Sequence, residues 1–508
     1  MADLKDSYDA VVIGAGMAGL TCGALLAHEG MAVLVADRLP RPGGYCTSLP
    51  GDGFSFDPAV AILEGCDRGG IVAQTLSDLK VEDELELLPL DPLSEIIGPG
   101  YKLTVRRRLA GFGEDLKSLA PAESENVDRF LNECQAVYKQ MALMAAGSPD
   151  LMGTGEKLAF LKDLLLKCGA VRKYGGRSAR EVTHSSFADP KLRTILHGMA
   201  LFLDPGTQAT ILMNMLGMMA AEDVFYPRQG GVMALPDTLA KALQRDGGVL
   251  ALDTEVTKIV LAGDTVTGVE LAGGARVSAG CVISAVDGRE TFLKLIGEEH
   301  LGAKEIRELS EAKVYGSVVV VSLGVDMDLR SAGLTASEVS YCPVNDVDEL
   351  FGTDPGKVGL GIRLHSLLDP TQAPQGHGTV VLVASFPYDY EDRWRGAAED
   401  PGREEYEELK QSLADRLVAS AENVLPGLSR HIVYERVATP VTLERATLNS
   451  RGSAMGWYPS PGGKMRSQKT RFRHLYQAGH WTFPGGSVPA VVASGRNAAQ
   501  LALRDRRP

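Results

Sequence analysis

The sequence predicts an α/β fold with two domains, both discontinuous along the chain. The first observation is a short apolar run, Tyr8–Ile13, that leads into three glycines with the spacing G-x-G-x-x-G: Gly14, Gly16 and Gly19. A helix-like segment then ends at Gly30, and a second apolar run, 31–36, ends at Asp37. The third observation is a glycine-rich segment at the other end of the chain, residues 479–499. Strand, glycine turn, helix and strand in this order are typical of a dinucleotide-binding βαβ unit.

Each part of the first motif has a physical role in such a unit. Gly14 permits the tight turn, Gly16 lets the backbone approach a pyrophosphate, and Gly19 lets the helix pack closely on the strand. The helix N-terminus offers unpaired N–H groups to phosphate. Asp37 is placed to accept hydrogen bonds from ribose hydroxyls. With 57 glycines in the chain, incidental glycines in an ordinary strand–turn–helix are the alternative, but the surrounding strands favour a Rossmann-type FAD-binding domain.

The remaining segments can be assigned to two domains. We expect the FAD-binding domain to contain residues 1–114, 230–310 and 471–508. A substrate-binding domain of mixed α+β structure, with a helical insertion, would contain residues 115–229 and 311–470. The alternation of apolar residues over 249–286 predicts a β-meander whose last strand returns to the first sheet. Other strand-like and helix-like segments support the second domain: strands at 316–323 and 378–385, and helices at 125–145, 156–169 and 404–425.

Composition excludes several classes of protein. The net charge of −13 over 508 residues argues against a nucleic-acid partner, which needs clustered cations. It also disfavours purely electrostatic docking on anionic lipid, while an apolar, peripheral membrane contact remains open. Seven cysteines without C-x-x-C pairs indicate a reducing compartment and no metal site. The sequence shows no signal peptide and no long apolar span, so we expect a cytoplasmic protein.

Taken together, the motifs resemble a known family. Their order is GAGMAGL, Asp37-Arg38, PGGYCTS, GFSFDPA, YPRQGG, VISAVD and finally GHWTFPGGSVPAVVASGRNAA. This order is similar to that of the flavin-dependent amine oxidase superfamily, and within it to the branch of phytoene desaturases, carotenoid isomerases and retinol saturases. The resemblance covers both ends and residues 226–290, and it is weaker across the two insertions.

The resemblance implies a set of FAD-binding residues. Those that would bind the nucleotide half are Gly14, Gly16, Gly19, Asp37, Arg38, Gly43, Gly44 and Val256. Those that would lie at the pyrophosphate and the isoalloxazine ring are Gly479, Gly485, Gly486, Ser487 and Val488. The helix that follows would direct its positive end towards a reduced flavin. Cys46 and Cys281 are more typical of packed small side chains than of covalent tethers, so we expect noncovalent FAD.

Candidates for catalysis are fewer. His480 adjoins the flavin-binding turn and could donate a proton or form a structural hydrogen bond. Arg228 could stabilise reduced flavin or bind an acidic substrate, or it could belong to a surface ion pair. Glu64 could act as an acid or base, or simply cap a local turn. A methionine-rich stretch suits a long apolar ligand, although its members could equally be helical core: Met199, Met213, Met215, Met218 and Met219.

We therefore expect an FAD-dependent oxidoreductase that desaturates, isomerises or saturates carbon–carbon bonds of an apolar, isoprenoid- or carotenoid-like substrate. Hydride would pass between carbon and flavin N5. Because the chain holds one G-x-G-x-x-G, the electron acceptor would be oxygen, a quinone or transiently bound NAD(P). Two alternatives are an amine or amino-acid oxidase, and a non-catalytic prenyl-lipid carrier like the Rab GDP-dissociation inhibitors.

Overall fold

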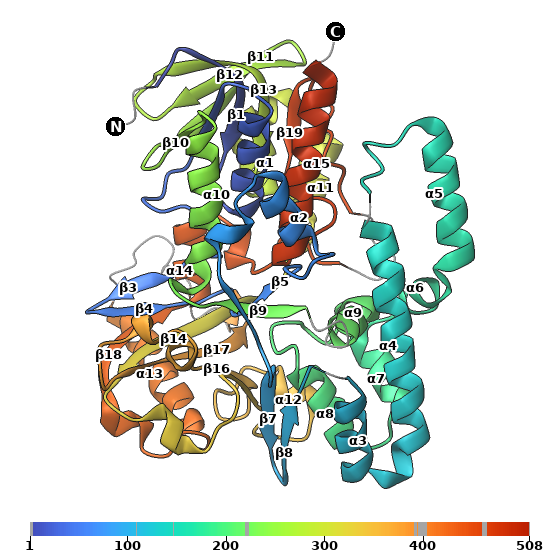
Figure 1. Cartoon of the computed structure of the whole chain (residues 1–508), viewed down its shortest axis with the longest axis vertical. Helices are drawn as coiled ribbons and strands as arrows, with labels where there is room; N and C mark the ends of the chain where they lie inside the picture. The colour runs from blue at the N-terminus through green and yellow to red at the C-terminus, as the bar shows by residue number, and fades with distance from the viewer. Residues whose placement is uncertain are drawn as a thin grey trace.

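Two large β-sheets and a set of helices beside them make up the molecule (Figure 1). The computed structural model describes residues 4–107, 109–145, 147–218, 223–390, 394, 404–459 and 465–506. Helices and both parallel and antiparallel strands are present. The predicted α/β fold is therefore confirmed.

The first sheet is built on the predicted βαβ unit. Its strand order is β10-β2-β1-β13-β12-β11, with β19 also beside β13. The strands β10, β2, β1, β13 and β19 run parallel, whereas β12 and β11 continue the sheet antiparallel. The predicted meander and its returning strand are thus confirmed. The strands span β1 Ser7–Ile13, β2 Val33–Ala36, β10 Val249–Ala251, β11 Val256–Ala262, β12 Thr265–Leu271, β13 Arg276–Ser284 and β19 Leu475–Gln477.

Helices α1 (Met17–His28), α10 (Ala234–Arg245) and α15 (Val488–Arg506) pack beside this sheet. The continuous apolar residues of β1 and β2 are buried, as parallel strands covered on both faces require. Helix α15 lies against α1 so closely that a Cβ on Gly495 would lie 2.4 Å from the carbonyl oxygen of Ala18. The last helix of the chain therefore contacts the first (Figure 1).

The second sheet has the order β18-β14-β17-β16-β15-β7-β8. The predicted strands at 316–323 and 378–385 are confirmed as β14 and β17. One expectation is wrong: residues 94–105, assigned by sequence to the FAD-binding domain, form β7 and β8 and join this sheet through β15. The strands span β7 Ser94–Gly98, β8 Tyr101–Val105, β14 Ser317–Val325, β15 Glu338–Tyr341, β16 Leu360–Arg363, β17 Gly378–Phe386 and β18 Ile432–Ala438.

Short strands connect the two sheets. Strand β9 (Val224–Pro227) pairs antiparallel with β5 (Leu63–Glu64) and with β6 (Leu87–Pro89). Strands β3 (Leu49–Gly51) and β4 (Phe54–Phe56) form a hairpin. These pairings bring the segment after Asp37 to the second sheet, because the Phe54 and Phe56 rings are buried against residues of β14 and β17.

The helical insertion lies beside both sheets (Figure 1). Helix α4 contacts α9, and the predicted helices at 125–145, 156–169 and 404–425 are confirmed as α4, α5 and α13. No helix in these described ranges is both long and apolar enough to cross a bilayer. The helices span α2 Ile71–Asp78, α3 Leu109–Leu119, α4 Ser124–Ala145, α5 Thr154–Lys167, α6 Gly169–Tyr174, α7 Ala179–Ser186, α8 Pro190–Gly198, α9 Ala209–Met218, α11 Ala303–Glu311, α12 Val347–Leu350, α13 Glu404–Ala421 and α14 Pro440–Thr447.

Candidate active site

A cavity of about 860 Å³ extends from the first sheet to the second. Its wall includes the glycine turn after β1, the turn before α15, the inner face of β14–β18 and part of α9. Residues from the two ends of the chain therefore line one cavity. Such cavities at the carboxyl end of parallel strands are the usual place for a dinucleotide.

The glycine turn fits its predicted roles at each position. Gly14 has φ +98°, and a Cβ there would lie 2.9 Å from the Val286 Cγ1 atom. A Cβ on Gly19 would lie 1.9 Å from the Gly14 carbonyl oxygen, so this glycine permits the helix to pack. Gly16 is different: it lines the cavity, and a Cβ there meets no protein atom within 4 Å. The space beside Gly16, at the N-terminus of α1, is thus open to a ligand.

The adjoining nucleotide-binding candidates also line the cavity: Asp37, Arg38, Gly43, Gly44 and Val256. The Asp37 carboxylate accepts hydrogen bonds from the backbone N–H of Ala15 (2.7 Å) and of Leu39 (2.8 Å). Burial raises the pKa of Asp37, and these two hydrogen bonds oppose the rise. The Arg38 guanidinium donates to the carbonyl oxygen of Arg445, so Arg38 is held against α14.

The C-terminal turn forms the opposite part of the wall. Gly479, Gly486, Ser487 and Val488 line the cavity, whereas Gly485 is not among its lining residues. A Cβ on Gly486 would lie 2.8 Å from the Met455 Cβ atom, and one on Gly485 would lie 2.9 Å from the Met465 methyl carbon. Gly486 therefore permits close packing against the Met455 backbone, whereas Gly485 is favoured by its φ of +110°, because the exposed Met465 side chain could move away.

His480 and Trp481 also line the cavity. The Nε2 atom of His480 is buried and has no hydrogen-bond partner in the described structure. Burial lowers the pKa of His480 to about 4, so the ring is neutral at neutral pH. Trp481 is held by a hydrogen bond from its Nε1 to the Asn449 side chain (3.1 Å). An orphaned polar atom in the same cavity as the open glycine cradle fits a long cofactor with a polar ring system, as FAD has.

Glu64 lies on β5 and lines the same cavity. Burial, together with the nearby charge of Asp223, raises the pKa of Glu64 to about 7. Asp223 itself accepts hydrogen bonds from the backbone N–H of Gly65 (2.7 Å) and of Cys66 (2.9 Å). A Cβ on Gly65 would lie 3.0 Å from Pro489 of α15, so Glu64 adjoins the C-terminal turn.

Of the two interpretations of Arg228, the structure supports the surface ion pair. Arg228 is half exposed, forms an ion pair with Glu86, and is not among the residues that line the cavity. Of the methionines, Met199, Met215 and Met218 line the cavity, whereas Met213 is buried in the core. Met219 lies outside the described residues. Met213 therefore belongs to the helical core, and a contact with an apolar ligand stays a prediction for Met199, Met215 and Met218.

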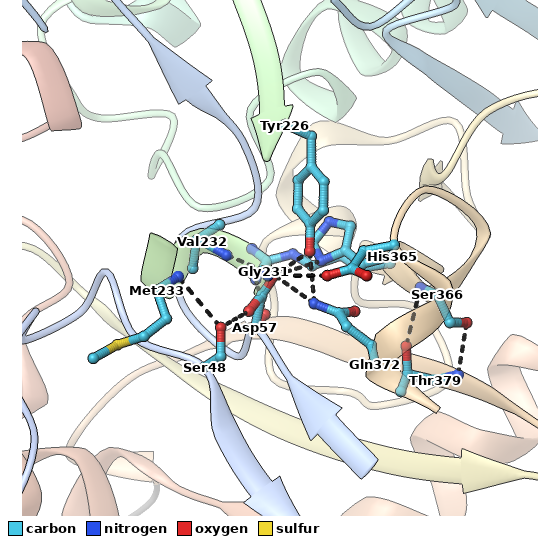
Figure 2. A network of polar contacts seen from close by, with 12 residues as sticks. Ser48, Asp57, Tyr226, Gly231, Val232, Met233, His365, Ser366, Gln372 and Thr379 are labelled. Carbon is cyan, nitrogen blue, oxygen red and sulfur yellow. Dashed lines mark hydrogen bonds and ion pairs between the residues drawn. The ribbon is translucent and has the colours of Figure 1, made fainter. Parts of the chain in front are cut away.

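Sequence reasoning missed a buried polar cluster centred on Asp57 (Figure 2). Its carboxylate accepts hydrogen bonds from Ser48 Oγ (2.5 Å), from the Tyr226 hydroxyl and from Gln372 Nε2 (3.1 Å). His365 Nδ1 lies 3.4 Å from Asp57 Oδ2, and its Nε2 lies 2.5 Å from Glu338 Oε1. The cluster therefore joins the segment after β2, strand β9 and the end of β16.

In this cluster, the charged forms of His365 and Asp57 stabilise each other. Burial alone would lower the pKa of His365, but the carboxylates of Glu338 and Asp57 outweigh burial and raise it to about 9. Burial alone would raise the pKa of Asp57, but His365, Ser48 and Tyr226 lower it. At neutral pH the cluster thus holds a protonated His365 between two carboxylates.

The chain is similar to several known proteins. The family model described as flavin containing amine oxidoreductase matches residues 17–503. The chain is 28% identical to prolycopene isomerase 1 of an Oncidium hybrid cultivar, over 99% of this chain and 86% of the relative. It is 26% identical to a lycopene-forming phytoene desaturase of Pseudescherichia vulneris, over 97% and 99% of the two chains. A solved variant of putrescine oxidase has the same fold, with TM-score 0.65, 14% identity and coverage of 98% and 99%.

Proposed function

The chain belongs to the family of flavin-containing amine oxidoreductases, and from this premise we propose that its substrate is an apolar, isoprenoid- or carotenoid-like polyene. The reaction makes, shifts or saturates a carbon–carbon double bond, and the first two of these match the names of the curated relatives, a desaturase and an isomerase. The carrying observation is that one cavity continues from the FAD cradle to walls of valine and methionine, among them Val320, Val383 and Met215. Such walls bind an apolar chain at about 0.8 kcal/mol for each buried methylene.

The residues of the cavity have different roles in this reaction. FAD supplies hydride acceptance and donation at N5. Gly16 and the N-terminus of α1 hold its phosphates, and the C-terminal turn holds its ring end. His480 is neutral and offers a hydrogen-bonding nitrogen. Glu64 exchanges a proton with the carbon skeleton, because its pKa near 7 lets it accept and return a proton at neutral pH.

The proposal is tested by anaerobic mixing of purified protein with ligands. A polyene such as phytoene or prolycopene is expected to bleach the oxidised flavin, to re-oxidise the reduced flavin, or to be isomerised without net redox change. Product analysis separates these three reactions, and oxygen or a quinone then serves as the acceptor. Bleaching by primary amines, with no conversion of any polyene, would show an amine oxidase instead.

Replacing Glu64 by glutamine is expected to lower kcat about 100-fold, because a positioned proton acceptor is lost. In the unchanged protein the rate is expected to rise with pH through about 7, since the carboxylate form accepts the proton. The measurement is kcat between pH 5 and 9 in both proteins. His480→Gln is the matched control, because His480 is already neutral over this range and its loss leaves the pH limb in place. If kcat of Glu64→Gln still rises with pH through about 7, Glu64 is not the proton acceptor.

We also propose that helix α5 is a peripheral docking surface for an anionic bilayer. In the described structure α5 has no buried residue, and it stands at the outer edge of the helical insertion (Figure 1). Four leucines on it are exposed by 71, 54, 62 and 70%: Leu158, Leu161, Leu165 and Leu166. The first three are spaced i, i+3 and i+7, and so share one face. An exposed apolar patch of this kind marks an interaction surface.

Charge favours a bilayer as the occupant of this surface. The chain as a whole carries −13, yet residues 153–173 contain five basic and two acidic side chains. An amphipathic helix with leucines on one face and lysines beside them inserts into the headgroup region of anionic membranes. Docking there would hold the protein at the phase in which polyenes dissolve.

The double variant Leu158→Ser, Leu165→Ser is expected to bind vesicles at least 10-fold more weakly than the unchanged protein. Each leucine that leaves water contributes about 1.5–3 kcal/mol. The measurement is co-sedimentation with vesicles of phosphatidylcholine and phosphatidylserine. Val433→Ser is the matched control, since Val433 is 52% exposed on β18. Equal sedimentation of all three proteins, or a leucine-dependent dimer in light scattering, would contradict membrane docking.

A further inference from the structure

An ion pair lies in the wall of the cavity, on the second sheet. Glu338 of β15 is directly opposite Arg363 of β16 in the antiparallel register, so the two side chains share one face of the sheet. Arg363 Nε lies 3.8 Å from Glu338 Oε2, and their side chains are 13% and 19% exposed. Both residues line the cavity, as do the neighbouring Gly361 and Val383. A charged pair is thus set into a largely apolar wall.

The pair keeps hydrogen-bonding capacity that protein atoms do not use. Glu338 Oε1 contacts His365, and Arg363 Nη1 donates to the Asp57 carbonyl oxygen (3.2 Å). Among the described residues, no acceptor is hydrogen-bonded to Nη2 of Arg363. Nη2 is therefore not fully enclosed by protein atoms. Because Arg363 lines the cavity, this nitrogen is open to the cavity. A guanidinium has five N–H donors in a fixed plane, and the two on Nη2 remain for a ligand.

A substrate made only of carbon and hydrogen would leave these donors unpaired when it displaces water. An unsatisfied buried polar group costs about 1–3 kcal/mol, and more when it is charged. The local charge also decides which polar group fits. The cations Arg363 and His365 are balanced by Glu338 and Asp57, so this cluster itself offers no excess positive charge to a further anion. A neutral oxygen can accept from Arg363, and a hydroxyl can also donate to Glu338.

We propose that the substrate carries a hydroxyl or carbonyl group, and that Arg363 and Glu338 bind this oxygen and set how far the chain extends towards the flavin. The proposal rests on the apolar substrate class proposed above and narrows it from hydrocarbons to oxygenated isoprenoids. Arg363 and Glu338 are specificity-determining residues in this scheme. They do not touch the reacting carbons.

The test compares two ligands on the unchanged holoprotein. The probes are geranylgeraniol and the corresponding hydrocarbon that lacks the hydroxyl, and the readout is the perturbation of the flavin spectrum at equilibrium without turnover. We expect the alcohol to bind at least 10-fold more tightly. Equal affinities for the two ligands would overturn the proposal but leave the apolar substrate class intact. Failure of both ligands to perturb the flavin, with failure of every polyene to react, would overturn both proposals.

Variants then assign the preference to its residues. Arg363→Met is expected to abolish the preference for the alcohol while hydrocarbon binding is retained or improved. Glu338→Gln is expected to weaken the preference for the alcohol only partly, since the amide oxygen of glutamine still accepts a hydrogen bond from a hydroxyl. Arg416→Met is the matched control. Arg416 lies on α13, forms an exposed ion pair with Asp354 and does not line the cavity. A preference that survives in Arg363→Met would overturn the assignment, and the two-ligand comparison stands even if that variant does not fold.

Discussion

Replacing Gly16 by valine is expected to give a folded protein without flavin. The backbone at Gly16 has φ −69° and ψ 175°, which any residue adopts without strain. A Cβ there meets no protein atom within 4 Å, so the fold tolerates a side chain. The valine would, however, occupy the open space at the N-terminus of α1, where the pyrophosphate binds. We expect complete loss of the visible flavin absorbance, with the far-ultraviolet circular dichroism unchanged.

A matched control separates this effect from a general effect of valine. Gly302 precedes α11 with φ −79° and ψ 148°, also meets no atom within 4 Å, and does not line the cavity. Gly302→Val is therefore expected to retain flavin. Gly19→Val is not a useful substitute, because its Cβ would lie 1.9 Å from the Gly14 carbonyl oxygen and would disturb folding itself. A yellow Gly16→Val protein would refute the role of Gly16.

The contrast between Gly16 and Gly19 shows what a sequence can predict. Strand, turn and helix are encoded by neighbouring residues, so the first sheet and the glycine cradle followed from local rules. Strands β7 and β8 lie in the range expected for the FAD-binding domain but pair into the second sheet, and their partner there, β15, lies more than 230 residues further along the chain. No local pattern specifies such a pairing. Distant segments could be predicted to meet where each carries a recognisable motif or pattern, as residues 249–286 and 479–499 do, and residues 94–105 carry none.

The direction in which a side chain points is a second property that the sequence did not predict. Arg228 precedes the Gly230–Gly231 turn, and this position suggested the flavin. The pairing of β9 with β6 instead brings Arg228 beside Glu86 at the surface. Asp57 is the opposite case: the sequence contained it only as part of a motif and gave it no role, yet it lies at the centre of a buried cluster. Its partners His365 and Gln372 lie over 300 positions away, so the cluster was visible only once the two sheets were placed together.

Replacing Asp57 by alanine is expected to lower the free energy of unfolding by about 3–5 kcal/mol. The change removes one partner of a buried charge pair and leaves the protonated His365 with Glu338 alone. It also leaves the hydroxyls of Ser48 and Tyr226 without their acceptor. Ser48→Ala is the control, because it leaves the charge pair intact. It removes the short hydrogen bond to Asp57, worth about 1 kcal/mol, and two long contacts, with the Met233 N–H (3.4 Å) and the Gly230 carbonyl oxygen (3.5 Å). Denaturant unfolding at pH 7 measures all three proteins, and a cost for Asp57→Ala no larger than that for Ser48→Ala would contradict the network.

The pH dependence of stability identifies His365 as the cation of this network. Its pKa is about 9 in the folded protein and 6.5 when unperturbed. The native state therefore holds a proton that the unfolded state releases between these values, so stability falls as pH rises from about 6.5 to about 9. The difference corresponds to about 3 kcal/mol. In His365→Gln the fall is expected to disappear, and in Asp57→Ala to shrink. An equally steep fall in His365→Gln would assign the proton to another group, and Asp57 would then stabilise the fold through its neutral hydrogen bonds alone.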